Sequence, residues 1–177
     1  SVPDADKFWS KRSEWDFGDF KRASKYSLAA LDKKDGKIAW DVPLDISGDI
    51  DVTWMSVNNN KIFIQSIIQN NMSIFSHDIK NGAKLWEMSL DISDFYQSYG
   101  LKPVFYSGNL LVPLDAKIKY INTENGIVYR EYSDDDIDQI ISFNENSIQN
   151  NNLLFFIEDI DYEYVMIDLE KNIKLAG

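Results

Sequence analysis

The sequence of 177 residues contains no cysteine and one histidine, His77. The lack of cysteine excludes disulfides, cysteine-ligated zinc and thiol catalysis, and a single histidine excludes metal sites built from several imidazoles. Glycine-rich phosphate loops, Gly-x-Ser-x-Gly elbows and zinc-protease helices are missing as well. We therefore expect a protein that is not an enzyme and that uses no cofactor and no metal. A carboxylate pair assembled by folding is the catalytic alternative that the sequence leaves open.

Long apolar runs are also lacking. No stretch approaches the ~18 apolar residues that a membrane-spanning helix needs, so we expect no membrane span. The first residues, SVPDADKFW, contain neither an initiator methionine nor the hydrophobic segment of a signal peptide. A processed or trimmed N-terminus is the expectation, and the cellular compartment stays open.

Basic residues are in the minority, since 18 Lys and Arg stand against 29 Asp and Glu, for a net charge of −11. Such a chain repels nucleic acid and anionic lipid, whereas a basic protein is its natural electrostatic complement. Residues 1–25 contain six basic and five acidic side chains, so the whole negative excess belongs to the rest of the chain. Solubility alone is the other explanation of this charge.

The chain repeats itself. Residues 27–47 and 73–93 align without a gap at an offset of 46 and share nine positions. In each copy an apolar stretch precedes a polar turn with glycine, Gly36 or Gly82, and a second apolar run containing tryptophan follows. Glycine adopts positive φ without a Cβ clash, so each copy predicts a β-hairpin.

Two weaker copies extend the pattern. Residues 118–132 have Arg130 where the first copies have tryptophan, and residues 164–175 have Asn172 where they have glycine. The period is therefore about 44–46 residues. Further strands are expected between the hairpins at residues 52–57, 61–68, 104–106, 109–113, 140–143 and 153–158, with an asparagine-rich loop at 144–152.

Four short strands in each period are typical of a β-propeller blade. We predict an all-β fold of antiparallel four-stranded blades, which is a partial or small β-propeller. The first period provides only its last two strands, at about 24–46, so the chain amounts to nearly three and a half blades. Pro43 supports this assignment, because proline belongs on an edge and Pro43 falls in the outermost strand.

The motif Ala30-Leu31-Asp32…Gly36-Lys37-Ile38-Ala39-Trp40, with its second copy Ser76-His77-Asp78…Gly82-Ala83-Lys84-Leu85-Trp86, resembles the quinoprotein-type (PQQ-like) propeller repeat. The resemblance covers roughly residues 24–177 and implies that both tryptophans pack between neighbouring blades. Quinone-dependent members of that family hold their cofactor with a vicinal disulfide and calcium. Without cysteine, the resemblance does not extend to quinone chemistry.

Residues 1–23 are predicted to form an N-terminal arm or cap, with a short helix at about 4–14 or an irregular course, and residues 24–177 form the propeller-like domain. The arm contains Trp9 and Trp15 among alternating charges. An open array of sheets leaves an apolar end exposed, and repeat proteins normally cap such ends. The alternatives are that the arm completes the first blade, that two chains combine, or that the chain is a fragment.

His77 is interpreted as a packing residue. It precedes Asp78 in a predicted strand, and consecutive strand residues point to opposite faces, so the two cannot form an ordinary acid–base pair. His77 also occupies the repeat position of Leu31.

The candidate binding residues are acidic clusters and loop tyrosines, because clustered carboxylates attract a basic protein and tyrosines dominate binding hot spots. Calcium ligation and solvated loops are the other interpretations of the clusters. The candidates are Asp45, Asp49, Asp51, Tyr96, Tyr99, Asp134, Asp135, Asp136, Asp138, Glu158, Asp159, Asp161 and Glu163.

Two functional hypotheses follow. The first is a non-catalytic protein-binding module, most concretely a bacterial immunity-type protein that neutralises a basic toxin in the cytoplasm. The second is a periplasmic or extracellular propeller scaffold or sensor that self-associates through open blade edges or assembles other proteins.

Overall fold

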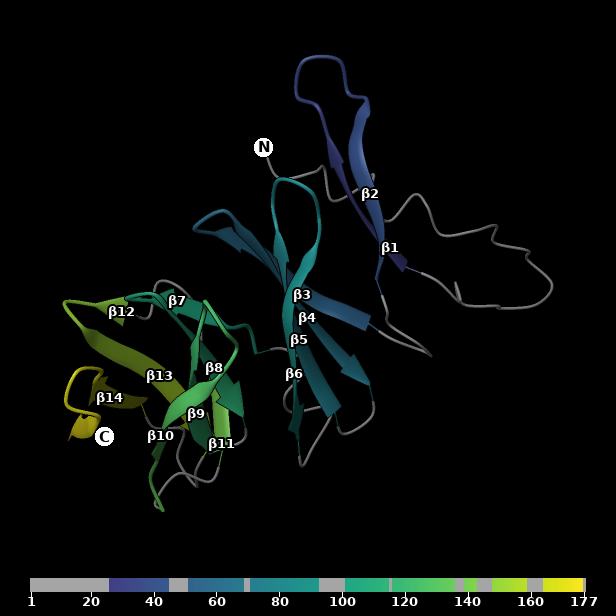
Figure 1. The fold of residues 1–177 in the computed structure, drawn as a ribbon. Helices are drawn as coiled ribbons and strands as arrows, with labels where there is room; N and C mark the ends of the chain where they lie inside the picture. The colour runs from purple at the N-terminus through teal and green to yellow at the C-terminus, as the bar shows by residue number, and fades with distance from the viewer. Residues whose placement is uncertain are drawn as a thin grey trace.

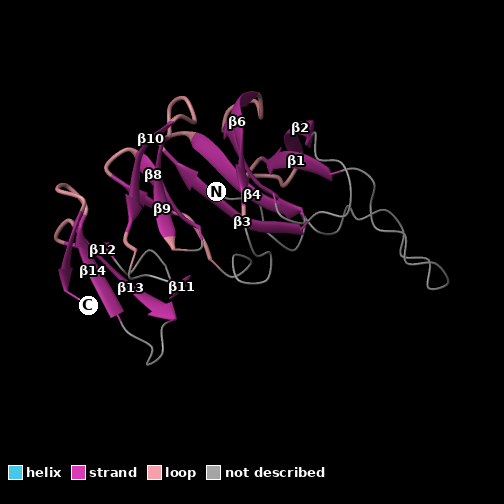
Figure 2. Cartoon of the chain, turned by 90° about the horizontal axis from the view of Figure 1, so that it is seen from below, coloured by secondary structure: helices cyan, strands magenta, loops and turns pink. Residues whose placement is uncertain are grey.

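The computed structural model describes residues 26–44, 51–68, 71–92, 101–114, 116–135, 139–142, 148–158 and 164–176. These residues form fifteen strands and no helix (Figure 2). The strands build four antiparallel sheets that follow one another in chain order (Figure 1). Since the described residues contain no helix, none of them provides a helical membrane span. The helix expected at about 4–14 lies outside the described residues.

The sheets are named by their order in the chain. Sheet 1 pairs β1 (Tyr26–Leu31) with β2 (Ile38–Leu44), and sheet 2 has the order β3 (Asp51–Asn58), β4 (Lys61–Ile68), β5 (Asn71–Asp78), β6 (Lys84–Asp91). Sheet 3 contains β7 (Val104–Tyr106), β8 (Asn109–Leu114), β9 (Lys117–Asn122) and β10 (Val128–Ser133). Sheet 4 has the order β11 (Gln139–Ser142), β13 (Asn152–Glu158), β14 (Tyr164–Asp168), β15 (Ile173–Ala176), and β12 (Ile148–Gln149) also pairs with β13.

This is the partial or small β-propeller expected from the repeat, with two strands in sheet 1 and full blades after it. Pro43 lies opposite Ser27 in β2, an edge strand of sheet 1, and edge strands are where proline is tolerated. One detail differs: the asparagine-rich loop at 144–152 contains β12 and the start of β13. Asn150 and Asn151 adopt positive φ and form a tight hairpin there, because asparagine tolerates the left-handed region.

Three apolar clusters hold the array together, one for each pair of neighbouring sheets. Leu28 of sheet 1 packs with Ile64 and Phe75 of sheet 2, and all three are nearly inaccessible to solvent. The other face of sheet 2 packs on sheet 3, and the other face of sheet 3 packs on sheet 4. Sheets 2 and 3 are therefore covered on both faces, as the central blades of a propeller are.

The strands of each sheet end at two opposite sides that differ in chemistry. On one side each sheet has one repeat turn, at residues 32–37, 78–83, 122–127 or 168–173. At the opposite strand ends the chain passes from one sheet to the next or turns back within a sheet. We call this side of the sheets the connection edge. The register places the ends of strands in each sheet together there, with Asn71 opposite both Ile68 and Asp91 in sheet 2.

Candidate functional site

The repeat turns share one hydrogen-bonding pattern that explains their sequence. The first residue of each turn is Asp or Asn, namely Asp32, Asp78, Asn122 or Asp168, and its side-chain oxygen accepts the backbone N–H two residues later at 2.7–3.0 Å. Its carbonyl accepts the N–H of the residue four positions later at 2.7–2.9 Å. That later residue has φ between +60° and +72° in all four turns. An Asx side chain and a left-handed glycine or asparagine therefore define each turn locally.

Every repeat turn after the first also accepts a hydrogen bond from the preceding sheet. The indole N–H of Trp40 donates to the carbonyl of Ile79 at 3.1 Å, and that of Trp86 donates to the carbonyl of Thr123 at 3.0 Å. Ile79 and Thr123 occupy the same position in their turns. The prediction that the two tryptophans fill equivalent interfaces is confirmed.

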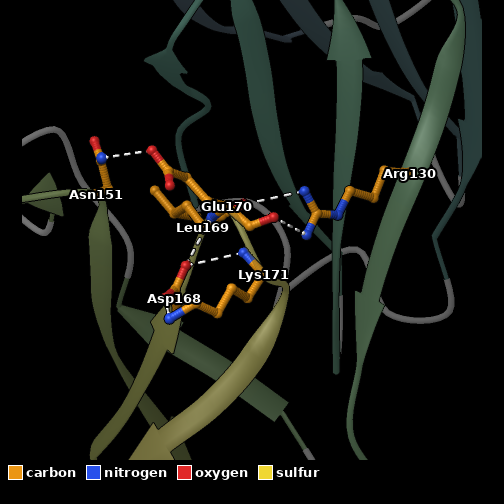
Figure 3. Close-up of polar contacts among 6 residues, drawn as sticks. All are labelled: Arg130, Asn151, Asp168, Leu169, Glu170 and Lys171. Carbon is orange, nitrogen blue, oxygen red and sulfur yellow. Dashed lines mark hydrogen bonds and ion pairs between the residues drawn. The ribbon is translucent and has the colours of Figure 1, made fainter.

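Arg130 makes the third of these contacts, although its replacement of tryptophan is what makes the third sequence copy look weak. Its guanidinium donates from Nη1 to the carbonyl of Leu169 at 3.1 Å and from Nη2 to that of Glu170 at 3.0 Å (Figure 3). The same guanidinium lies 5.1 Å from the centroid of the Tyr120 ring, within reach of a cation–π interaction. Arg130 follows Gly126 by four residues, as the tryptophans follow their glycines, and this constant spacing is the sequence signal that identifies Arg130 as the third donor.

The donor and the turn residue that faces it are matched in size. A Cβ added to Gly82 would lie 2.7 Å from the Trp40 ring, and one added to Gly126 would lie 2.6 Å from the Trp86 ring. The Arg130 interface instead has Asn172, whose side-chain amide donates to the carbonyl of Glu131 at 3.1 Å. A broad indole therefore requires glycine opposite it, whereas the narrower guanidinium leaves room for asparagine.

Further polar contacts fasten the last repeat turn. The Asn151 side chain donates to Glu170 at 2.7 Å, and Lys171 forms an ion pair with Asp168 at 3.1 Å (Figure 3). Hydrogen bonds from the backbone and side chain of Lys171 lower the pKa of the Asp168 carboxyl. All of these contacts stabilise the last repeat turn.

His77 is buried in the face of sheet 2 that packs on sheet 1, which confirms its packing role. Its Nδ1 lies 2.8 Å from the carbonyl of Gly82, and its Nε2 has no partner among the described residues. Burial lowers the pKa of the imidazole, and the contact with the Gly82 carbonyl opposes that shift. Asp78 points the other way and caps its own turn.

Two buried tyrosines have raised pKa values for a similar reason. Burial raises the pKa of Tyr120 to about 12, and its hydroxyl has no partner among the described residues. Burial also raises the pKa of Tyr132, whose hydroxyl donates to Asp134 at 3.3 Å. Both rings belong to the cluster between sheets 3 and 4. These two tyrosines thus lie between sheets, where packing explains their pKa shifts.

The candidate acidic residues that the structure describes lie at or directly beside strand ends on the connection edge. Asp134 is half-buried, accepts from Tyr132 and lies 3.7 Å from Lys174, whereas Asp135 is exposed. Asp51 begins β3 and Glu158 ends β13. Outside the described residues lie Asp45, Asp49, Tyr96, Tyr99, Asp136, Asp138, Asp159, Asp161 and Glu163. Within the described segments, no three His, Asp or Glu side chains are placed to hold a metal ion.

A set of exposed apolar side chains was not predicted from the sequence. Leu85, Tyr129 and Leu175 each follow the turn's glycine position by three residues, and their exposed fractions are 45%, 53% and 48%. Each lies at a register shift of the outer strand of its sheet, which turns the side chain out of the core. An apolar residue recurring at this one position is the signal that reveals them.

No family model and no curated protein matches the chain. Among solved structures, it is similar to a europium-containing methanol dehydrogenase, with a TM-score of 0.52 and 9% identity over 72% of this chain and 26% of that one. It is also similar to quinohemoprotein alcohol dehydrogenase ADHIIG from Pseudomonas putida HK5, with a TM-score of 0.49 and 12% identity over 88% and 33% of the two chains. The Neurospora crassa Pan2 WD40 domain matches with a TM-score of 0.48 and 13% identity over 86% and 46%.

The chain thus spans less than half of each of these structures. At 9% identity, the likeness to the methanol dehydrogenase shows the fold alone. Together with the four sheets and their three interfaces, it defines the class of the protein. The chain is an all-β protein with the fold of a partial or small β-propeller.

Proposed function

We propose that this chain is a non-catalytic protein-binding module whose connection edge docks a basic protein. The observation that carries the proposal is topological. The acidic clusters follow β2, β10 and β13, and the segment with Tyr96 and Tyr99 follows β6. These strands belong to different sheets, yet all four end at the connection edge.

Charge is distributed accordingly. The described residues contain 14 Asp and Glu and 12 Lys and Arg, so they are nearly balanced. The remaining segments after residue 25 contain ten Asp and Glu and no Lys or Arg. All but one of these ten, Glu145, lie in segments that join strands at the connection edge. A concentration of one sign of charge speeds the encounter with an oppositely charged protein.

In our proposal, the most strongly displaced pKa values have a structural origin. The displaced pKa values of His77, Tyr120 and Tyr132 have burial between sheets as their first cause. Catalytic groups with displaced pKa values instead face a cleft that admits substrate.

The repeats themselves are, in our proposal, of the quinoprotein type without its cofactor chemistry. Trp40 and Trp86 support this, because each fills an interface between blades as the resemblance implies. A protein of this kind fits an immunity-type inhibitor of a basic toxin and also a scaffold that assembles other proteins.

A charge-neutralising comparison tests the binding role. Asp135→Asn, Asp136→Asn and Asp138→Asn are combined in one variant, and Asp35→Asn, Glu87→Gln and Glu124→Gln in a control that removes the same charge elsewhere. Affinity for a decalysine peptide is measured by calorimetry at about 50 and 300 mM salt, since a Debye length of about 10 Å at 0.1 M makes such binding salt-dependent.

The first variant is expected to weaken binding at low salt at least about threefold more than the control does. Equal weakening by both variants would show that only net charge matters and would remove the basis for a specific acidic edge.

A further inference from the structure

The first repeat turn, residues 32–37, has the geometry of a turn that receives an indole, but no described residue occupies it. Gly36 has φ +69°, close to the +72° of Gly82 and Gly126, and its N–H donates to the Asp32 carbonyl at 2.8 Å. A Cβ added to Gly36 would meet no described atom within 4 Å. Gly82 and Gly126, by contrast, lie directly against tryptophan rings.

The apolar face beside this turn is also open. Leu31 is only partly buried, whereas its repeat equivalents His77, Ile121 and Ile167 are 3%, 0% and 0% exposed. Ile38 pairs with Leu31 and is 54% exposed. In sheet 3 the corresponding pair, Ile121 and Val128, packs against sheet 2. The described residues therefore leave the outer face of sheet 1 without the cover that each later sheet receives.

We propose that Trp15 covers this face, with its ring over Gly36 and its indole N–H donating to the carbonyl of Lys33. Lys33 occupies the position of Ile79 and Thr123, whose carbonyls accept the other two indoles. The segment before Tyr26 would then act as an intramolecular cap on the open end of the array.

Charge selects Trp15 over Trp9. The first repeat turn contains Lys33, Lys34 and Lys37, all exposed, while the second and third turns contain at most one lysine. Trp15 lies between Glu14 and Asp16, which complement these lysines, whereas basic residues flank the stretch around Trp9. Ten residues separate Trp15 from Tyr26 and span about 33 Å when extended, which is enough to return along the roughly 20 Å of β1.

A second copy of the chain is a poorer occupant. The position four residues after the turn's glycine, which supplies the donor in sheets 1 to 3, is Ala176 in sheet 4. Alanine has neither a side-chain N–H nor a ring, so stacking sheet 4 of one copy on sheet 1 of another would leave the Lys33 carbonyl without its donor.

Disulfide trapping tests the placement directly, because the chain has no cysteine of its own. Lys34→Cys is combined with Ser13→Cys, beside Trp15, or with Ser10→Cys, beside Trp9, and the intramolecular disulfide is quantified in glutathione buffers. The two loops differ by only three residues, so closure entropy favours neither by as much as twofold. We expect the Ser13 pair to form at least about tenfold more favourably. Equal formation, or mainly intermolecular disulfides, would overturn the proposal.

A thermodynamic cycle gives an independent reading. Gly36→Ala is compared with Gly108→Ala, since both glycines have positive φ and neither has a described atom near an added Cβ. In the otherwise native chain, Gly36→Ala should raise the unfolding equilibrium constant about tenfold more than Gly108→Ala, because it also crowds the Trp15 ring. The excess should vanish in a Trp15→Ala background and persist with Trp9→Ala. No excess, or an excess that either background removes equally, would refute the cap.

Discussion

Trp40 and Gly82 lie 42 positions apart in the chain and meet across the interface between sheets 1 and 2. The ring of Trp40 lies so close to Gly82 that a Cβ added to the glycine would be 2.7 Å from it. Trp86 and Gly126 repeat the arrangement between sheets 2 and 3 at 2.6 Å. In each pair, the glycine gives its turn the positive φ, and the tryptophan donates a hydrogen bond to a carbonyl of that same turn.

Alanine at Gly82 should destabilise the protein more than alanine at Gly108. Both substitutions force a left-handed residue, at about 1–2 kcal/mol. Gly82→Ala also drives a methyl group into Trp40, which adds about 1–3 kcal/mol of overpacking. Urea unfolding of both variants measures the difference. Equal losses would mean that the Trp40 ring moves aside without cost.

The indole N–H of Trp86 should contribute measurably to stability. Trp86→Phe leaves the Thr123 carbonyl without its donor in a buried interface, so we expect a loss of about 1–3 kcal/mol. Trp54→Phe is the control, because Trp54 packs on Phe105 and its indole N–H makes no hydrogen bond to another described residue. If chemical denaturation gives the same loss for both, the hydrogen bond contributes nothing beyond packing.

Arg130 and Asn172 should be exchangeable only as a pair. Arg130→Trp alone places an indole against the Asn172 side chain and should destabilise the protein by about 1–3 kcal/mol. Adding Asn172→Gly recreates the pairing of Trp86 with Gly126 and should recover much of that loss. A double-mutant cycle from thermal or urea unfolding measures the coupling. Additive effects would show that the two positions are independent.

Stability should decrease as the pH falls below about 6.5 through His77. Burial holds the imidazole pKa below its ordinary value of 6.5, so the unfolded chain takes up a proton more readily than the folded one. The contribution is complete above pH 6.5 and is lost as the pH approaches the lower pKa of the folded state. His77→Leu, which restores the residue type of Leu31, should flatten this dependence between pH 7.5 and 5. An unchanged pH profile would place the titration elsewhere.

The Tyr120 hydroxyl should be dispensable. It is buried without a partner among the described residues, so Tyr120→Phe removes an unpaired polar group and should leave stability unchanged or increase it by up to about 1 kcal/mol. Because burial raises the pKa of Tyr120 to about 12, the native chain should lose stability above pH 10, where the unfolded tyrosine ionises first. The variant should lose less. Unfolding curves at pH 7 and 10.5 test both statements, and a clear loss at pH 7 would contradict them.

Local chemistry made the strands and turns predictable. Glycine and Asx residues specify their turns through short-range backbone geometry, and alternating apolar residues specify the strands between them. β4 and β7 have the predicted bounds, β3, β8 and β13 extend beyond the predicted bounds by one residue at one or both ends, and β11 is shifted by one residue. The segment around β12 differs, since a polar, asparagine-rich stretch has no apolar alternation to mark its hairpin.

The interfaces were only partly predictable. The tryptophans could be assigned to them because a repeated large apolar residue indicates a repeated contact. Arg130 could not, because its role depends on carbonyls about 40 residues away that only the folded chain brings within hydrogen-bond distance.

By itself, the sequence determined the period, the repeat turns and therefore the antiparallel sheets, because all of these depend on residues close together in the chain. The tertiary structure decided which side chains meet between sheets and why glycine or asparagine stands opposite each donor. It also decided that acidic segments from different sheets begin at the same edge. Those relationships depend on the stacking of whole sheets, and stacking is determined by distant surfaces that fit together.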